Sequence, residues 1–203
     1  MLIKVCGLRD NFQEVAALNP DFAGMIFYEK SPRFVGKNDS EILKQKILGV
    51  KKVGVFVNAS ENYIFDNVLK YNLDFVQLHG GETVDFCEKI RQKVPVIKAF
   101  GILSEEDLVA AQNYAQTVDY LLFDTKTKGY GGSGQKFDWK MLGNIVFKKK
   151  FFLSGGISLE DLAEIKALKI NDLAGVDLNS RFELSPAKKD IEKLQQAINF
   201  LRK

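Results

Sequence analysis

The chain has 203 residues, of which 46% are hydrophobic and 27% are charged, and 29 basic against 26 acidic residues give a net charge of +3. This composition excludes fibrous and disordered classes, and the mixing of the two charge signs excludes a nucleic-acid footprint, which needs Lys and Arg gathered on one face. Because there is no run of about 20 apolar residues and no signal-peptide layout at residues 1–4, we predict a cytoplasmic protein that binds neither nucleic acid nor a membrane.

Short runs rich in β-branched and aromatic residues recur along the chain, and several are apolar almost throughout. This pattern is typical of strands buried on both faces of a parallel sheet. The predicted strands are residues 2–6, 23–28, 52–57, 74–79, 94–100, 119–124, 151–154 and 173–178. Helical periodicity lies between them, at residues 60–70, 83–92, 104–115, 158–168 and 187–201. Ser104 and Ser158 are each followed three residues later by an aspartate, which is a cap signal for a helix start.

The strand starts recur at close to the roughly 30-residue spacing of a βαβ unit. Strict alternation of strand and helix through eight units predicts one closed (β/α)8 barrel, a TIM barrel, formed by residues 1–203 as a single domain. The competing architecture is an open doubly wound sheet. Eight strands without a break favour closure, because an open sheet would need protected edges.

In a (β/α)8 barrel the active site lies at the C-terminal ends of the strands, so the residues that close each strand are the candidates for chemistry. Cys6, His79 and Asp124 close the first, fourth and sixth predicted strands. The only other cysteine, Cys87, shares a helical face with apolar neighbours and is expected in the core. Two cysteines so far apart predict thiols rather than a disulfide framework.

Two turns at the same end of the barrel have the composition of a phosphate site. Gly155 and Gly156 follow the seventh predicted strand and open a helix, and Asn179 and Ser180 follow the eighth. Glycines allow backbone N–H groups to approach an anion closely, and the loops after strands seven and eight are the usual phosphate site of this fold. We therefore expect a phosphorylated small molecule as the ligand.

Three other side chains have two interpretations each. Asp124 ends an apolar strand, where desolvation would raise its pKa and suit a general acid, or it forms a loop hydrogen bond. His79, the only histidine, binds substrate or makes a structural hydrogen bond, and a single histidine does not predict a metal site. Arg33, after a proline, clamps a substrate carboxylate or is simply exposed.

Two lysines lie within predicted strands. By the period of two, Lys4 points the same way as Cys6, where its charge would favour the thiolate. Lys98 supports a different hypothesis, a carbon–carbon lyase that forms a Schiff base with a sugar phosphate. The loop 125–136 contains a literal G-x-G-x-x-G, but it starts too far beyond the strand for a dinucleotide site. A lid over the substrate is the better interpretation of this loop.

Taken together, motifs spread over nearly the whole chain resemble those of the phosphoribosylanthranilate isomerases of tryptophan biosynthesis. The matching segments are Lys-Val-Cys-Gly (4–7), Phe-Tyr-x-Lys-Ser-Pro-Arg (27–33), Val-Gly-Val-Phe-Val-Asn (53–58), Val-Gln-Leu-His-Gly (76–80), Phe-Asp-Thr-Lys (123–126), Tyr-Gly-Gly-Ser-Gly (130–134), Phe-Asp-Trp (137–139) and Leu-Ser-Gly-Gly (153–156).

The resemblance implies an Amadori rearrangement of N-(5-phosphoribosyl)anthranilate, with Asp124 as the general acid and Cys6 as the general base. It also implies that Arg33 holds the anthranilate carboxylate and that no metal or organic cofactor takes part. A barrel that binds a phosphorylated ligand without catalysis is the remaining alternative. The motifs are compatible with a monomer or a homodimer.

Two segments after the last predicted strand depart from the family pattern. Where the family has Asp-Val-Ser-Ser-Gly-Val-Glu, this chain has Arg181 in place of the glycine, and where it has Pro-Gly-x-Lys-Asp, this chain has Ala187. The arginine puts the backbone geometry of the phosphate turn in question, although its charge would suit an anion.

Overall fold

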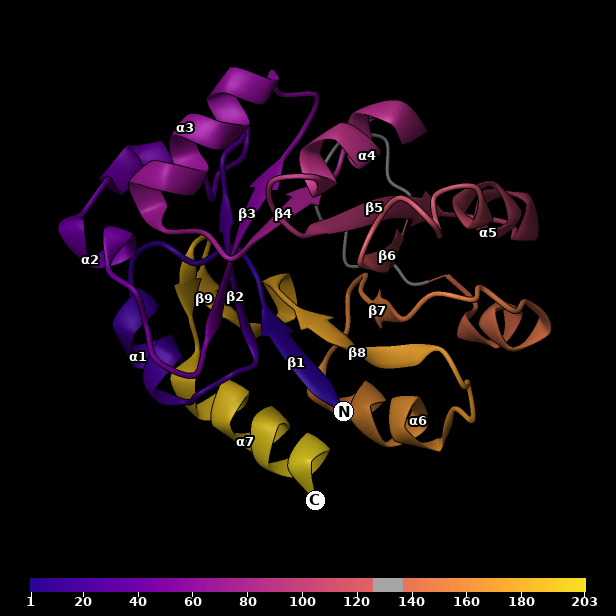
Figure 1. Ribbon diagram of the computed structural model, residues 1–203. Helices are drawn as coiled ribbons and strands as arrows, with labels where there is room; N and C mark the ends of the chain where they lie inside the picture. Colours follow the sequence, from indigo (N-terminus) through magenta and orange to yellow (C-terminus); the bar gives the residue numbers. More distant parts are fainter. Residues whose placement is uncertain (126–136) are drawn as a thin grey trace.

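The computed structural model describes residues 1–125 and 137–203. Eight parallel strands form a closed barrel in sequence order, with the helices outside the ring of strands (Figure 1). The strands are β1 (Leu2–Val5), β2 (Phe22–Ile26), β3 (Lys51–Phe56), β4 (Phe75–Leu78), β5 (Val96–Ile102), β6 (Tyr120–Thr125), β7 (Phe151–Leu153) and β8 (Leu173–Leu178). Because β1 pairs with β8, the open doubly wound sheet is excluded.

The segments between the strands contain α-helices and short 3₁₀ helices. The α-helices are α1 (Phe12–Ala17), α2 (Glu41–Lys44), α3 (Glu61–Tyr71), α4 (Val84–Arg91), α5 (Glu105–Gln112), α6 (Leu162–Ala167) and α7 (Ile191–Arg202). The 3₁₀ helices are η1 (Val35–Asn38), η2 (Trp139–Asn144), η3 (Leu159–Asp161) and η4 (Ser180–Phe182). No helix in the described parts of the chain is long and apolar enough to span a membrane.

All eight predicted strands are confirmed, and so are the two predicted caps, since Ser104 with Asp107 and Ser158 with Asp161 form capping boxes. The described part of the crossover from β6 to β7, for which no helix was predicted, contains η2. One predicted boundary is wrong: the last helix begins at Ile191 and not at residue 187, because residues 183–189 form an antiparallel hairpin of β9 (Glu183–Ser185) and β10 (Lys188–Lys189).

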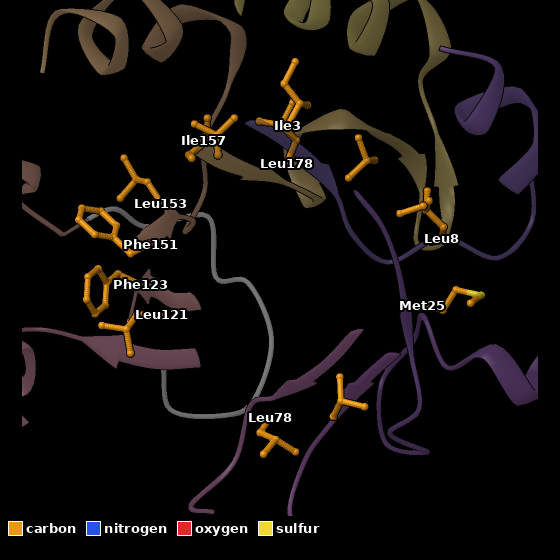
Figure 2. Close-up of a cluster of buried hydrophobic side chains, with 14 of the residues drawn as sticks. Ile3, Leu8, Met25, Leu78, Leu121, Phe123, Phe151, Leu153, Ile157 and Leu178 are labelled. Atoms are coloured by element: carbon orange, nitrogen blue, oxygen red, sulfur yellow. The ribbon is translucent and has the colours of Figure 1, made fainter. Parts of the chain in front are cut away.

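Apolar side chains on the outer face of the barrel pack against the surrounding helices. Figure 2 shows part of this layer, in which Ile3, Met25, Leu78, Phe123 and Leu153 point outward from their strands. Burial of each such side chain contributes about 1.5–3 kcal/mol. This layer therefore supplies most of the apolar burial that fixes the ring.

A second, smaller cluster fills the inside of the barrel near the starts of the strands. It is centred on Phe22, whose ring lies 5.3 Å from those of Phe75 and Phe152 in edge-on geometry. Such aromatic pairs add about 0.5–1.5 kcal/mol beyond burial. The cluster closes the N-terminal end of the barrel.

The period of two along each strand then places polar residues at the other end of the interior. On β1 the inward positions run from Leu2, packed on the inner cluster, through Lys4 to Cys6. On β4 they run from Phe75 through Gln77 to His79. The inward-facing residues of each strand are thus apolar at the N-terminal end of the barrel and polar at its C-terminal end.

Candidate active site

A pocket opens at the C-terminal ends of the strands, and all eight predicted site residues line it or the recess beside it. Its lining includes Cys6, Arg33, His79 and Asp124. The adjoining recess is lined by Gly155, Gly156 and Ser180, and the two share Asp124, Ser154, Asp177 and Asn179. The residues predicted from the strand ends therefore come together from six of the eight barrel units.

The thiol of Cys6 lies in this pocket beside a buried ion pair. Lys4 Nζ donates to Asp177 Oδ2 at 2.9 Å, and these two residues are direct neighbours in the register of β1 with β8. The Lys4 ammonium is also close enough to the thiol for its charge to favour the thiolate. A Cβ on Gly24 of β2 would lie 2.9 Å from Cys6 Sγ and 3.3 Å from Lys4 Nζ. Only glycine at that position leaves room for both groups.

The pKa of the Cys6 thiol is raised above its ordinary value of 9.0, chiefly because burial disfavours the thiolate. Lys4 and Lys189 oppose this shift, while the charge of Asp177 reinforces it. The expectation that Lys4 lowers the pKa of Cys6 is right for the interaction between these two residues. It is wrong for the net shift of this pKa, because the effect of burial outweighs that of the Lys4 and Lys189 ammonium groups.

Asp124 faces the same pocket from the end of β6. Burial, reinforced by the charge of Asp177, raises the pKa of Asp124 from its ordinary 3.8 to about 6. The backbone N–H of Thr125 donates to Asp124 Oδ1 at 2.8 Å and limits the rise. A carboxyl in this range exchanges a proton near neutral pH, as a general acid must.

His79 is neutral, because burial and the charges of Lys98 and Lys4 lower its pKa to about 4. Its Nδ1 lies 3.1 Å from Gln77 Nε2, and its Nε2 lies 3.7 Å from Asp124 Oδ2. With the Gln77 amide donating to Nδ1, the remaining proton resides on Nε2, on the side of Asp124. His79 therefore makes a side-chain hydrogen bond to its neighbour in β4 and also borders the acid.

Arg33 is partly buried at the pocket wall rather than fully exposed on the surface. Its Nε lies 2.9 and 3.0 Å from the two carboxylate oxygens of Glu183, and its Nη2 lies 2.6 Å from Oε2. The Nη1 amino group makes none of these three contacts. A substrate carboxylate would meet a guanidinium that Glu183 already holds in one orientation.

The glycine turn after β7, predicted as a phosphate site, has a backbone that glycine favours. Gly155 and Gly156 have φ values of +95° and +67°, which L side chains rarely adopt. A Cβ on Gly155 would also lie 2.4 Å from Thr125 Oγ1. Arg181 does not have positive φ, so replacing the family's glycine leaves this turn unstrained. Its side chain is exposed, and the lining of the recess does not include it.

Sequence reasoning missed three buried polar residues at the site. Gln77 lines the pocket, Glu183 binds Arg33, and Lys189 donates to both Glu183 and Asn179. For Gln77 the signal was available, since it is two residues before His79 and so faces inward as well. For Glu183 and Lys189 only the family motifs marked the positions, because the hairpin that carries them was predicted as loop and helix.

Lys98 does not support the lyase hypothesis. Its neighbours Ile97 and Ala99 face the inner cluster, so Lys98 points away from the barrel interior. Its Nζ binds Glu82 Oε2 at 3.0 Å and three backbone carbonyls, and the linings of the pocket and recess do not include it. An amine held in this way does not meet a substrate carbonyl.

Two other predictions concern what the site holds or what covers it. Within residues 1–125 and 137–203 no group of three or more His, Cys, Asp or Glu side chains could hold a metal ion. The predicted lid lies outside the described residues, except for Thr125 at its start.

The fold and the pocket define a class before any comparison. A closed (β/α)8 barrel with a protonatable carboxyl and a thiol near a buried lysine facing one pocket suits acid–base chemistry. Residues 3–200 match the model of the N-(5'-phosphoribosyl)anthranilate (PRA) isomerase family. The chain belongs to this family and is an aldose–ketose isomerase.

Relatives support the family over the whole length of the chain. The chain is 44% identical over 203 residues to the N-(5'-phosphoribosyl)anthranilate isomerase of Parabacteroides distasonis, covering 98% of this chain and 92% of that protein. The crystal structure of phosphoribosyl anthranilate isomerase from Thermotoga maritima superposes with a TM-score of 0.87 at 34% identity, covering 100% and 99% of the two chains. A PRA isomerase in complex with reduced 1-(o-carboxyphenylamino)-1-deoxyribulose 5-phosphate superposes with a TM-score of 0.83 at 31% identity, covering 100% and 98%.

Proposed function

We propose that this chain converts N-(5-phosphoribosyl)anthranilate into 1-(2-carboxyphenylamino)-1-deoxyribulose 5-phosphate, with Asp124 as the general acid and Cys6 as the general base. One observation carries the assignment. A carboxyl with a pKa of about 6 and a thiol whose thiolate is favoured by the charge of a buried lysine face one pocket from β6 and β1.

In the first step Asp124 gives its proton to the furanose ring oxygen. The bond between that oxygen and C1 breaks, and the electron pair of the anthranilate nitrogen forms the C=N bond of a Schiff base. Asp124 suits this step because its carboxyl is protonated in a useful fraction of molecules near neutral pH. Neutral His79 beside it adds no positive charge that would drive ionisation of the acid.

In the second step Cys6 removes the proton from C2 of the sugar. The electron pair of the C–H bond moves toward the cationic nitrogen and gives an enolamine, which tautomerises to the ketone. Cys6 needs its thiolate form, which the Lys4 ammonium stabilises against the effect of burial. The proposed mechanism requires neither a metal nor an organic cofactor.

The two charged ends of the substrate are assigned to different groups of residues. Arg33 holds the anthranilate carboxylate, whereas the backbone N–H groups at Gly155 and Gly156 with the Asn179-Ser180 turn hold the phosphate. The positive φ values of the two glycines, which turn successive N–H groups toward one side, support this assignment.

The sugar hydroxyls between the two ends need acceptors. Within the described residues, no hydrogen-bond donor reaches Asp177 Oδ1 or Gln77 Oε1, although both atoms are buried and both side chains line the pocket. A buried acceptor without a partner costs about 1–3 kcal/mol. We assign these two oxygens to the ribose hydroxyls, whose binding would remove that cost.

Three broader assignments accompany the activity. The whole chain acts as one domain, since the barrel begins at Leu2 and the last helix ends at Arg202. The enzyme works in the cytoplasm, which accords with two free thiols. The prediction of a monomer or homodimer stands, and the relative from Thermotoga maritima is described as dimeric.

The test is a fluorescence assay in which phosphoribosylanthranilate is generated in situ and its loss is followed. We expect the wild type to consume it and Cys6→Ala and Asp124→Ala each to lose about 100- to 10,000-fold in turnover, the range of general acid–base catalysis. Cys87→Ala, which removes the other thiol from a site outside the pocket, is the matched control and retains turnover. Full activity in both active-site variants would reject the mechanism.

A further inference from the structure

Lys189 is a fully buried lysine to which neither the barrel pattern nor the reaction assigned a role. It lies on β10, and its side chain is 0% exposed. Its Nζ donates to Asn179 Oδ1 at 2.8 Å, to Asn179 O at 3.2 Å and to Glu183 Oε1 at 2.8 Å. A buried ammonium in so specific a set of contacts orders the groups that it bonds.

The backbone of Lys189 is held in place by two hydrogen bonds with Asn11. Its backbone N–H donates to Asn11 Oδ1 at 2.9 Å, and Asn11 Nδ2 donates back to Lys189 O at 2.9 Å. Asn11 is buried and precedes α1, so β10 is tied to the first barrel unit. The ammonium is therefore presented by a rigid strand rather than by a free loop.

Glu183 extends these contacts from Lys189 to Arg33. The same Oε1 atom that accepts from Lys189 lies 2.9 Å from Arg33 Nε, and Oε2 lies 2.6 Å from Arg33 Nη2. The Glu183 side chain is only 5% exposed, so both pairs are largely removed from water. Arg33, Glu183, Lys189 and Asn179 form one continuous network, which we call the mouth network.

Two members of the mouth network, Arg33 and Asn179, lie beside the residue that follows Cys6. A Cβ on Gly7, the residue after Cys6, would lie 2.6 Å from Arg33 Cδ and 2.7 Å from Asn179 Oδ1. Arg33 and Asn179, assigned to the carboxylate and phosphate ends of the substrate, therefore flank the same backbone position. Their spacing is set by the two residues that bond them, Glu183 and Lys189.

The charge of the network also suits a ligand with two anionic ends. Two cations and one carboxylate leave one net positive charge, and the Glu183 carboxylate is shared between them. Shared in this way, it neutralises neither cation completely. The Lys189 charge also reaches Cys6, where it favours the thiolate.

We propose that Lys189 is a positioning residue that holds both anion-binding groups of the pocket, Asn179 directly and Arg33 through Glu183. The inference rests on the proposed function, because it takes from it the assignment of Asn179 to phosphate and Arg33 to carboxylate. Its tests measure binding as well as turnover, so the two proposals fail separately.

The experiment compares Lys189→Met, Lys189→Arg and Glu183→Gln with Lys188→Met as the matched control. Lys188 is the adjacent lysine of the same strand, but it is exposed and does not line the pocket. For each variant we would measure KM and kcat for phosphoribosylanthranilate. The dissociation constants of inorganic phosphate and of anthranilate, measured by calorimetry, probe the two ends of the site without catalysis.

We expect Lys189→Met to weaken both probes and to raise KM by about tenfold or more, the effect of losing a charge-assisted hydrogen bond. Lys189→Arg restores much of the phosphate affinity, because it keeps a charged donor. Glu183→Gln weakens anthranilate only, since Lys189 still bonds Asn179. A purely structural role would instead lower Tm and the active fraction while leaving KM unchanged.

Two results would overturn the proposal. One is a Lys189→Met enzyme whose KM and probe affinities equal those of Lys188→Met. The other is a Glu183→Gln enzyme that loses phosphate affinity as severely as Lys189→Met. If Lys189→Met does not fold, Glu183→Gln decides, because selective loss of anthranilate binding supports the network and unchanged binding of both probes rejects it. A wild type that binds both probes but does not turn over the substrate would refute the function alone.

Discussion

Replacing Asp124 by Asn separates the catalytic role proposed for this residue from its effect on stability. The amide keeps the size of the carboxyl and can still accept the backbone hydrogen bond from Thr125 N–H. It has no proton to give to the ring oxygen, so turnover falls by about 100- to 10,000-fold. The same substitution stabilises the fold at neutral pH.

The sign follows from the direction of the pKa shift. The folded-state pKa of Asp124 is raised from 3.8 to about 6, so the folded protein resists ionisation that the unfolded chain undergoes freely. Stability is therefore lost as pH rises from 3.8 to about 6, and the cost is complete above that range. About 1.4 kcal/mol for each unit makes the cost about 3 kcal/mol for a carboxyl that is only 16% exposed. An Asn side chain does not ionise, so the variant avoids this cost.

The assay is urea unfolding of wild type and Asp124→Asn at pH 7.5 and pH 4.5. At the higher pH we expect the variant to be more stable by about 2–3 kcal/mol. At pH 4.5 the folded wild type is largely protonated at this position, so the difference in unfolding free energy shrinks. A difference that is the same at both pH values, or a variant that is less stable at pH 7.5, would refute the assignment of a desolvated, protonatable acid.

Three further predictions concern other parts of the molecule. The pH profile of kcat/KM should be a plateau that falls below about pH 6 and again on the alkaline side, where Cys6 with its raised pKa titrates, because Asp124 and Cys6 exchange protons at its edges as a coupled pair; a profile with a single edge would contradict it. Lys98→Met should leave Glu82 buried without its cation and lower the free energy of unfolding in urea by about 3–5 kcal/mol. The folded variant should keep turnover, and borohydride should trap an adduct in neither the variant nor the wild type. A trapped adduct in the wild type would support the lyase hypothesis. Ala187→Gly should stabilise the hairpin by about 0.5 kcal/mol, because glycine has no side-chain strain at the φ of +75° found there. This gain exceeds the loss that comes from the greater entropy of glycine in the unfolded chain. A loss of stability in the same unfolding assay would contradict the prediction.

The site could be predicted to the extent that it depends on strand ends and the period of two. Cys6, His79 and Asp124 close β1, β4 and β6 or follow them directly, and parallel strands in a closed barrel end on one side. Their convergence follows from topology alone. The glycine turn after β7 could be predicted as well, since both residues need a backbone that other side chains disfavour.

The partners of these residues depend on geometry that one-dimensional patterns do not contain. Arg33 was predicted as free to clamp a carboxylate, but Glu183 lies 150 residues away in sequence and binds it. The pKa of Cys6 was expected to fall, but the sign depends on how burial compares with three nearby charges. The sequence identifies Lys4 as a neighbour of the thiol without giving the desolvation that it must overcome.

Three buried lysines illustrate where the limit lies. Lys4, Lys98 and Lys189 are all removed from water, and each is bonded to a carboxylate. Their partners lie 173, 16 and 6 residues away in sequence, so no fixed spacing would have found all three pairs. Desolvation requires that each buried ammonium has polar partners, and in these three the partners include a carboxylate, whereas buried Lys52 bonds only backbone carbonyls among the described residues. The strand face on which each lysine lies decides whether its ammonium group is near the thiol, in the barrel wall or at the mouth of the pocket. The period of two assigns that face for Lys4 and Lys98, whereas Lys189 needed the hairpin β9–β10, whose turn contains Ala187 at a position that glycine occupies in the family pattern.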